Sequence, residues 1–228
     1  MPSYDPQHRA AALRREVHTH NHRYHVLQSP LISDEQFDKL MRQLQRIEAQ
    51  YPELITSDSP TQRVGGAPSQ KFQKVKHPTH ILSLGNANGV EETRAWFERI
   101  ARVDDRVEAA CFVVEPKIDG LTVILHYREG LFVQGATRGD GKTGEDITSN
   151  LRTVRTLPLS IPSGAITDPP RHLVVRGEAY MPIRAFMEWN QGLEVGGERT
   201  YVNPRNAVSG ALRQLDSKMT ATRPIALL

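Results

Sequence analysis

The stretch LTVILHYREGLFVQGA, residues 121–136, decides the fold class of this 228-residue chain. Residues 121–127 alternate as a half-buried strand does, 128–130 form a turn, and 131–136 return as a second strand. Two short apolar runs, 111–114 and 173–175, predict further strands. Because hairpin-joined strands pair antiparallel, the sequence predicts an α+β fold and not a doubly wound sheet.

The N-terminal third of the chain predicts a helical hairpin. Leu13, Val17, Tyr24 and Leu27 share one face of a first helix that ends before Pro30. A second helix starts with a capping box formed by a serine and a glutamine three residues later, and its apolar stripe comprises Phe37, Leu40, Met41, Leu44 and Ile47. Residues 57–68 resemble a linker, and residues 91–103 and 206–215 predict helices. We therefore expect two domains, 1–75 and 76–228.

Composition excludes several classes of protein. Hydrophobic residues make up 38% and charged residues 24%, which is ordinary for a globular chain, and no apolar run has the length of a membrane span. The first residues lack the layout of a signal peptide, so a cytoplasmic protein without membrane attachment is expected. Cys111 is the single cysteine, so it forms neither an internal disulfide nor a cysteine zinc site, and its apolar neighbours predict that it is buried.

The segment EPKIDG, residues 115–120, contains a candidate nucleophile. Lys117 lies between an apolar run and a glycine, with Glu115 and Asp119 beside it. A lysine attacks only when its amine is deprotonated, which partial burial at a strand end favours. Gly120 permits close approach of a ligand to the backbone. By itself this short pattern also fits a surface turn after a strand.

Two glycine-containing segments follow. ATRGDGKTGED, residues 136–146, combines three glycines with Arg138 and Lys142, so its backbone N–H groups could approach a phosphate or a ribose. The spacing of the glycines excludes a P-loop, and a flexible hairpin exit is the plain alternative. In VRGEAY, residues 175–180, Glu178 ends a strand and could accept hydrogen bonds from a ribose hydroxyl, although such edge carboxylates are usually just solvated.

The fourth segment, YVNPRNAVSGALRQLD at 201–216, predicts a helix that binds an anion. Asn203 can cap the helix with Pro204 at its first position. Arg205 in the first turn opposes the helix dipole, and Arg213 is expected on the same face, so the pair fits a diphosphate. Together the four segments supply a nucleophile, a sugar-binding carboxylate and phosphate-binding cations, the set needed for covalent nucleotidyl transfer.

These motifs, in this order, resemble the bacterial NAD-dependent DNA ligases. The hairpin residues YH (24–25) and PLISD (30–34), the FDKL run (37–40) and the ILSLGNA segment (81–87) resemble the same family. The resemblance covers the chain from about Leu13 onward. It implies a helical nicotinamide-mononucleotide-binding subdomain followed by a nucleotidyltransferase core, which is an ATP-grasp-like antiparallel sheet truncated at its C-terminal end.

The resemblance implies a role for each motif residue. Lys117 attacks the α-phosphate of NAD, supported by Asp119, and forms a lysine–AMP adduct that serves the sealing of nicked DNA in replication and repair. The AMP-binding set is Ser83, Leu84, Glu115, Arg138, Glu178, Arg205 and Arg213. The nicotinamide-binding set is Tyr24, His25, Asp34, Glu35, Gln36, Phe37 and Asp38. The family also implies Mg²⁺, held largely by phosphates and water, nicked double-stranded DNA as partner of the full-length protein, and a monomer.

Two departures from the family matter. Position 37 is phenylalanine where the family usually has tyrosine, so a hydroxyl group is missing. The chain also ends within what resembles the adenylation core, and zinc is expected only in the missing downstream region. The fragment alone is therefore expected not to seal nicks. An ATP-using nucleotidyltransferase and a fragment that binds NAD without turnover remain as alternatives.

One further pattern has the spacing of a metal site. His18, His22 and His25 share a helical face. No carboxylate or cysteine completes the set, so no metal site is predicted.

Overall fold

A computed structural model describes residues 5–25, 27, 29–63, 72–83, 85–161 and 170–228. Its core is a four-stranded antiparallel sheet in the order β3-β2-β5-β6. The strands are β2 (Leu121–Arg128), β3 (Leu131–Thr137), β5 (His172–Tyr180) and β6 (Ala226–Leu227). A second, two-stranded antiparallel sheet pairs β1 (Lys74–Lys76) with β4 (Thr143–Glu145). The predicted α+β class is confirmed.

The predicted hairpin between β2 and β3 is present. Glu129 and Gly130 both have positive φ angles, 48° and 79°, as the tight hairpin turns that match strand twist require. Glu129 is the only described non-glycine residue with a positive φ. The two strands flanking this turn pair antiparallel, and β5 pairs along the other edge of β2.

The two N-terminal helices form the predicted helical hairpin. Helix α1 (Pro6–His25) packs on α2 (Asp34–Gln50), and Leu13, Val17 and Leu44 are fully buried. The capping box of α2 is confirmed, since the Ser33 hydroxyl accepts from the Gln36 N–H and the Gln36 side chain accepts from the Ser33 N–H. The far end of the predicted α1 stripe is wrong: Tyr24 and Leu27 are about half exposed, and Leu27 lies beyond the end of α1 at His25.

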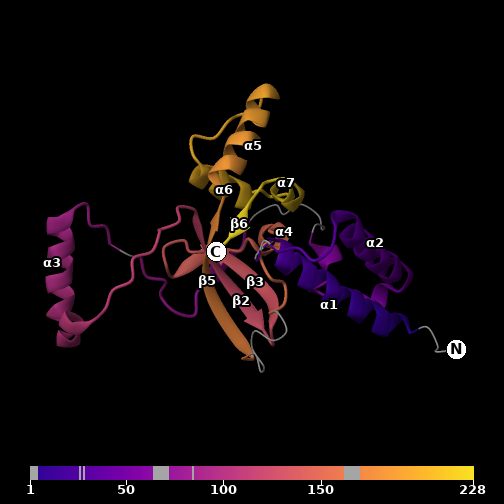
Figure 1. The fold of residues 1–228 in the computed structure, drawn as a ribbon, viewed down its shortest axis with the longest axis horizontal. Helices are drawn as coiled ribbons and strands as arrows, with labels where there is room; N and C mark the ends of the chain where they lie inside the picture. The colour runs from indigo at the N-terminus through magenta and orange to yellow at the C-terminus, as the bar shows by residue number, and fades with distance from the viewer. Residues whose placement is uncertain (1–4, 26, 28, 64–71, 84, 162–169) are drawn as a thin grey trace.

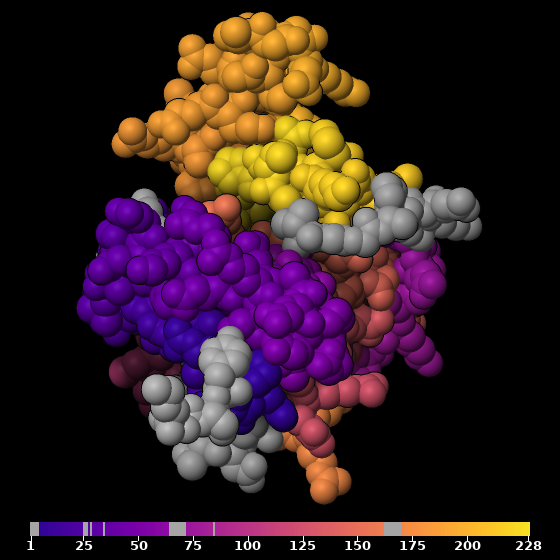
Figure 2. Space-filling view, turned by 90° about the vertical axis from the view of Figure 1, so that its right-hand side faces the viewer, coloured from indigo at the N-terminus to yellow at the C-terminus, as the bar shows by residue number. Residues whose placement is uncertain are grey.

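The remaining helices lie around the sheet. They are α3 (Val90–Ala101), α4 (Thr148–Thr153), α5 (Ile183–Val195), α6 (Pro204–Leu212) and α7 (Ser217–Ala221), with 3₁₀ turns at Pro52–Leu54, Pro60–Gln62 and Asp105–Ala109. In Figure 1, α1 and α2 lie to one side of the sheet, α3 lies on the opposite side, and α5 extends beyond the end where β6 lies. Figure 2 shows the helical hairpin covering one face of the molecule below the C-terminal helices.

The main hydrophobic core lies between the sheet and helices α4 and α6. Its fully buried members include Val123, Phe132, Leu151 and Leu212. A separate small core holds the helical hairpin together. This packed core supports the segments that contain the motif residues. They are the loop before β2, the loop after β3 and the end of β5.

Candidate active site

The segment that carries Lys117 is extended and exposed. Residues 110–119 form no helix or strand, and Glu115, Lys117 and Asp119 are all exposed. The predicted strand at 111–114 is therefore wrong, and so is the predicted burial of Cys111. A strand needs a partner for its backbone groups, and none of the described strands pairs with these residues.

Side-chain packing explains where this segment goes instead. The Phe112 ring packs edge-on against Trp96 and Phe97 of α3, at centroid distances of 5.9 and 5.8 Å. Val113 and Val114 are 85% and 95% exposed. The apolar run that suggests a buried strand is thus held by a neighbouring helix and not by the sheet.

Asp119 is held by an arginine from a distant helix. The Arg205 Nη1 donates to Asp119 Oδ1 at 2.5 Å, and both side chains are more than half exposed. Arg205 lies in the first turn of α6, which the Asn203 side chain caps as predicted by accepting from the Asn206 N–H at 2.8 Å. The structure therefore brings together one residue of the predicted catalytic set, Asp119, and one of the predicted phosphate-binding cations, Arg205.

Glu178 holds the start of β2 from the neighbouring strand. Its Oε1 accepts from the Gly120 N–H at 3.2 Å, and its Oε2 accepts from the Thr122 hydroxyl at 2.8 Å. The register pairs Thr122 with Glu178 across β2 and β5. Gly120 packs so closely that a Cβ there would lie 2.0 Å from the Ala179 carbonyl oxygen. Glu178 and Gly120 thus fix where Lys117 and Asp119 leave the sheet.

The glycine-rich loop after β3 folds back on itself. Gly139 and Gly141 have φ angles of 56° and 89°, which other residues adopt only with strain. Asp140 Oδ1 accepts from the backbone N–H groups of Thr143 and Lys142, and these bonds lower the pKa of the Asp140 carboxyl below its ordinary value. The loop is therefore a turn closed by hydrogen bonds among its own residues.

Arg138, which precedes this loop, meets the segment at 81–83. Its Nη1 donates to Ser83 Oγ at 2.7 Å, so two members of the predicted AMP-binding set are in contact. Leu84, the third member from this region, lies outside the described residues. Glu115 is exposed at the start of the Lys117 segment.

Arg213 occupies a different position from the one expected. Helix α6 ends at Leu212, so Arg213 is its C-terminal cap and does not continue the helical face of Arg205. The sequence predicts a helix from 206 to 215, but α6 ends two residues after Gly210. The prediction that helical spacing places Arg213 on the same face as Arg205 is therefore wrong. Arg213 Nε instead lies 3.0 Å from Glu145 Oε2, and Lys74 lies 3.7 Å from Glu145 Oε1.

Two residues that make contacts here are not predicted by the sequence patterns. Arg176 donates to the Leu82 carbonyl oxygen at 3.1 Å, and His77 Nε2 lies 3.0 Å from the Arg138 carbonyl oxygen. Together they tie the 77–83 segment to β5 and to the loop after β3. Arg176 could have been predicted as a site residue because it belongs to the VRGE motif. The sequence around His77 contains no pattern that would have predicted its contact.

A cavity of about 640 Å³ lies between the helical hairpin and residues of the linker and the core. Tyr24, Phe37 and Asp38 line it, so three residues of the predicted nicotinamide-binding set share one cavity. Glu35 is exposed and Gln36 is engaged in the capping box. His25 and Asp34 lie on α1 and α2, but their side chains are outside the described part of the structure.

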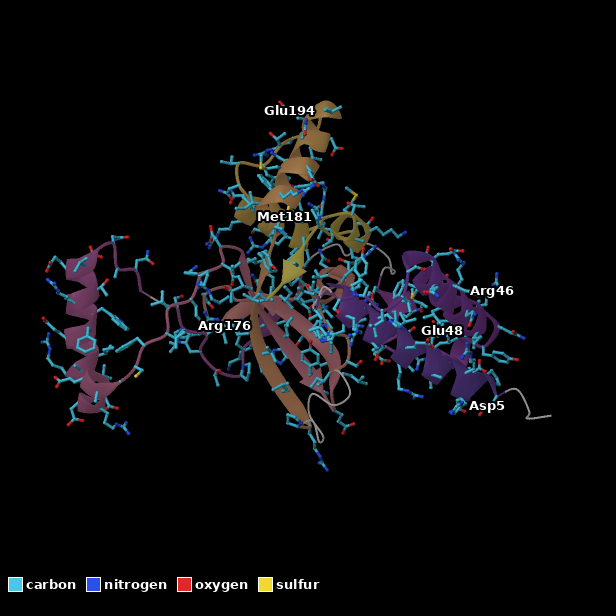
Figure 3. All side chains as sticks on the ribbon, viewed as in Figure 1. Asp5, Arg46, Glu48, Arg176, Met181 and Glu194 are labelled. Carbon is cyan, nitrogen blue, oxygen red and sulfur yellow. The ribbon has the colours of Figure 1, made fainter. Side chains whose placement is uncertain are left out.

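The cavity is not beside Lys117. Figure 3 shows Glu48 and Arg46 of the hairpin on one side of the sheet and Arg176 on the other, close to the segment that runs from α3 to β2. Beside the hairpin residues, the cavity is lined by Arg63, Thr153, Arg155 and Ala221 of the linker and the core, and by no residue of the Lys117 segment. The structure thus does not bring the two halves of the predicted NAD site together.

The described residues contain no group of three or more histidine, cysteine, aspartate or glutamate side chains placed to hold a metal ion. No described helix has the length and apolar character needed to cross a membrane. His18 lies 3.8 Å from Asp58 and belongs to a contact between the hairpin and the linker.

Comparison with known proteins agrees with this arrangement of motifs. Residues 69–228 match the family model described as the NAD-dependent DNA ligase adenylation domain. Residues 3–65 match a second model, the DNA ligase-like N-terminal NAD⁺-binding domain. This chain belongs to the NAD-dependent DNA ligase family.

Similar members of the ligase family come from several bacteria. A DNA ligase of Roseiflexus castenholzii is 51% identical over 233 residues, covering 99% of this chain and 32% of the relative. DNA ligases of Pelotomaculum thermopropionicum and Myxococcus xanthus are 52% and 49% identical, each over 96% of this chain and 31% and 32% of the relative. The chain thus spans about a third of the length of the relatives it matches.

Proposed function

We propose that this chain supplies the AMP-accepting part of an NAD-dependent DNA ligase, with Lys117 as the covalent carrier. The observation that carries the proposal is the anchoring of the Lys117-to-Gly120 segment by two residues from separate motifs. Arg205 holds Asp119, and Glu178 holds Gly120. Glu178 lies 58 positions from Gly120 and Arg205 lies 86 positions from Asp119, so tertiary contacts, and not only local ones, hold the segment in place.

The first step is the transfer of AMP to the amine of Lys117. The lone pair on Nζ forms a bond to the α-phosphorus of NAD, while the bond from that phosphorus to the oxygen of nicotinamide mononucleotide breaks. The departing oxygen takes the electron pair, and the proton of the attacking amine passes to solvent. AMP then passes to the 5′-phosphate of nicked DNA, and the 3′-hydroxyl displaces it to seal the strand. In-line placement and charge stabilisation supply the catalysis.

The cations around the segment provide that charge stabilisation. Arg205 and Arg213 each have a carboxylate partner now, Asp119 and Glu145, and a bound diphosphate would compete for both guanidinium groups. Ser83 and Arg138, already in contact, would hold the adenylate, together with Leu84, Glu115 and Glu178. The hydrogen bonds that Glu178 accepts in this structure leave part of its carboxylate for a ribose hydroxyl.

The hairpin would bind the nicotinamide mononucleotide half in the cavity lined by Tyr24, Phe37 and Asp38. Phe37 offers ring stacking without the hydroxyl that a tyrosine would add. Because no residue of the Lys117 segment lines this cavity, the proposal requires the hairpin to move as a unit relative to the core before AMP transfer.

Several further assignments belong to the same proposal. Mg²⁺ would be held mainly by the phosphates of NAD and by water, because Asp119 and Glu115 are exposed carboxylates without a third described ligand beside them. The division into domains would fall just before β1, close to residue 75, because β1 pairs with β4 of the core. The working state is a cytoplasmic monomer that binds nicked double-stranded DNA as part of a longer polypeptide.

A chimera tests the proposal. Residues 1–228 replace the matching third of the Roseiflexus castenholzii relative, and the intact mass is measured after incubation with NAD and Mg²⁺. The parent is expected to gain one AMP with NAD and none with ATP, and Lys117→Ala is expected to gain none. Lys218→Ala, which removes another exposed lysine, serves as the matched control. AMP on the Lys117→Ala chimera would refute the assignment, and AMP transfer from ATP would favour the ATP-using alternative.

The chain by itself tests the alternative of a fragment that binds NAD without ligating. We expect 1–228 alone not to close a nicked duplex. Nick closure by this piece would show that the parts absent from it are dispensable.

A further inference from the structure

A buried asparagine, Asn150, lies against the C-terminal end of helix α6. It belongs to α4, and only 2% of its surface is exposed. Its Nδ2 group donates to the carbonyl oxygens of Leu212 and Gln214 at 3.0 and 2.8 Å, and it lies 3.0 Å from Thr220 Oγ1. A polar side chain is costly to bury unless its hydrogen bonds are made, so these contacts explain how an amide is accommodated here.

The acceptors are carbonyl groups that a helix leaves free at its end. The last four carbonyl oxygens of an α-helix have no partner within the helix. Near the end of α6, the Thr220 hydroxyl donates to the Ala211 carbonyl oxygen at 2.8 Å, and Asn150 binds the carbonyl groups of Leu212 and Gln214. The end of α6 is therefore held from outside, by side chains of α4 and α7.

Arg213 lies between the two carbonyl groups that Asn150 binds. One belongs to the residue before it and the other to the residue after it. With φ of −106° and ψ of 22°, the Arg213 backbone has left the helix, so the helical pattern of hydrogen bonds does not by itself fix the direction of its side chain. The two bonds from Asn150 hold the chain on both sides of it instead.

The Arg213 side chain is held by the same segment that carries Asn150. Arg213 Nε lies 3.0 Å from Glu145 Oε2, and Glu145 is the last residue of β4, shortly before α4 begins. The segment from Glu145 to Asn150 thus holds both the backbone and the guanidinium of Arg213. A phosphate can compete with the Glu145 carboxylate for the guanidinium, but it does not compete with the backbone contacts of Asn150.

We propose that Asn150 is a positioning residue for AMP transfer, because it holds the chain on both sides of Arg213 and so sets where the guanidinium meets the phosphate. The inference rests on the proposed function, in which Arg213 stabilises the charge that develops on the phosphate. Asn150 is buried behind α6 and acts only through Arg213.

A double-mutant cycle in the chimera tests this role. The rate constant for AMP addition at saturating NAD is followed by intact mass in the parent, in Asn150→Ala, in Asn150→Asp, in Arg213→Ala and in the two double variants. Each Asn150 variant should lower the rate constant by at least about tenfold, because displacement of a charge-stabilising group by about 1 Å is enough for such a loss. In the Arg213→Ala background, the same Asn150 changes should alter the rate constant less than about twofold, since residues that act through one group are not additive.

The two Asn150 variants lose the N–H donors in different ways. Aspartate keeps the size of asparagine, whereas alanine adds no charge, so the two variants do not share a cause of misfolding. If one of them does not fold, the other carries the test.

A purely structural role would have a different kinetic signature. Loss of folded protein lowers the number of chains that ever take AMP but leaves the rate constant of the folded chains unchanged. Tyr127→Phe is the matched control, because it removes another buried hydrogen bond of the core, from the Tyr127 hydroxyl to the Pro158 carbonyl oxygen at 2.9 Å. It should lower the melting temperature and change the rate constant less than about twofold.

Two results would overturn the proposal. One is a rate constant within about twofold of the parent's in the Asn150 variants that fold. The other is a further loss of about tenfold or more when Asn150 is replaced in the Arg213→Ala chimera. Both can occur while Lys117→Ala still abolishes AMP addition, so failure of this inference is distinguishable from failure of the proposed function.

Discussion

Replacing Gly120 by alanine should damage both the stability of the core and the placement of Lys117. An added Cβ would lie 2.0 Å from the Ala179 carbonyl oxygen, which is 1.4 Å inside the 3.4 Å at which ordinary contact begins. The other near atoms also belong to the backbone of β5, at 2.9 and 3.2 Å, so no flexible side chain can move aside. The loop before β2 must shift by about 1 Å or more.

The expected cost follows from two terms. Overpacking against a rigid neighbour costs about 1 to 3 kcal/mol. The shift also breaks the 3.2 Å hydrogen bond from the Gly120 N–H to the Glu178 carboxylate, which is worth about 1.5 to 3 kcal/mol for a charged acceptor. A combined loss of about 2.5 to 6 kcal/mol lowers the melting temperature by about 5 to 24 °C in a chain of this length.

Thermal unfolding followed by circular dichroism measures this loss, and Gly192→Ala is the matched control. Gly192 lies in α5, and a methyl group added to it would have no atom within 4 Å, so alanine there should raise stability by up to about 1 kcal/mol. In the chimera with the Roseiflexus relative, Gly120→Ala should slow AMP transfer by about 100-fold. A Gly120→Ala chain that melts with the parent would refute the close-approach reasoning.

Three further outcomes are expected. Arg205→Gln should leave the melting temperature within about 2 °C of the parent's, because the ion pair between Arg205 and Asp119 is exposed. The same change should slow AMP transfer in the chimera by at least about tenfold. Equal rates of AMP transfer in variant and parent would show that Arg205 does not belong to the site. Arg63→Met should cost about 3 kcal/mol in urea unfolding, since three carbonyl oxygens lose a charged donor; a loss below about 1 kcal/mol would contradict this. His126 has its pKa lowered by burial and by repulsion from His172. The unfolded chain therefore binds the proton more tightly, so stability should fall as pH drops through about 6.5, and His126→Gln should flatten that slope between about pH 5 and 7; an unchanged slope would exclude this histidine.

Local signals in the sequence predict the elements whose structure is locally determined. The Ser33–Gln36 capping box needs only neighbouring backbone groups, and it forms where expected. The turn at Glu129 and Gly130 likewise depends on two residues and the alternation around them. Helix α6 begins at its predicted cap for the same reason. The hydrogen bonds of such features form between residues that are close in sequence. These features therefore depend little on contacts with the rest of the fold.

The errors come from features that depend on distant partners. Four apolar residues at 111–114 have the composition of a strand, but a strand forms only where another strand offers its backbone. Phe112 packs on Trp96 and Phe97 instead. Helical spacing places Arg213 beside Arg205, but the helix ends before it and Glu145 pairs with its side chain. Helices α4, α5 and α7 and strands β1 and β4 are not predicted at all.

The pairing register of β2 and β5 brings the segment around Gly120 and the segment around Glu178 together. β2 begins directly after Gly120, and the antiparallel pairing sets Thr122 opposite Glu178 near the end of β5. Side chains alternate between the two faces of a sheet, so a slip of one residue would turn Glu178 toward the core and away from Gly120 and Thr122. What prevents the slip is burial on the other face, where Val123 and Ala179 are fully buried. The polar site therefore depends on apolar side chains on the opposite face of the sheet, and its geometry will change with them before any motif residue is altered.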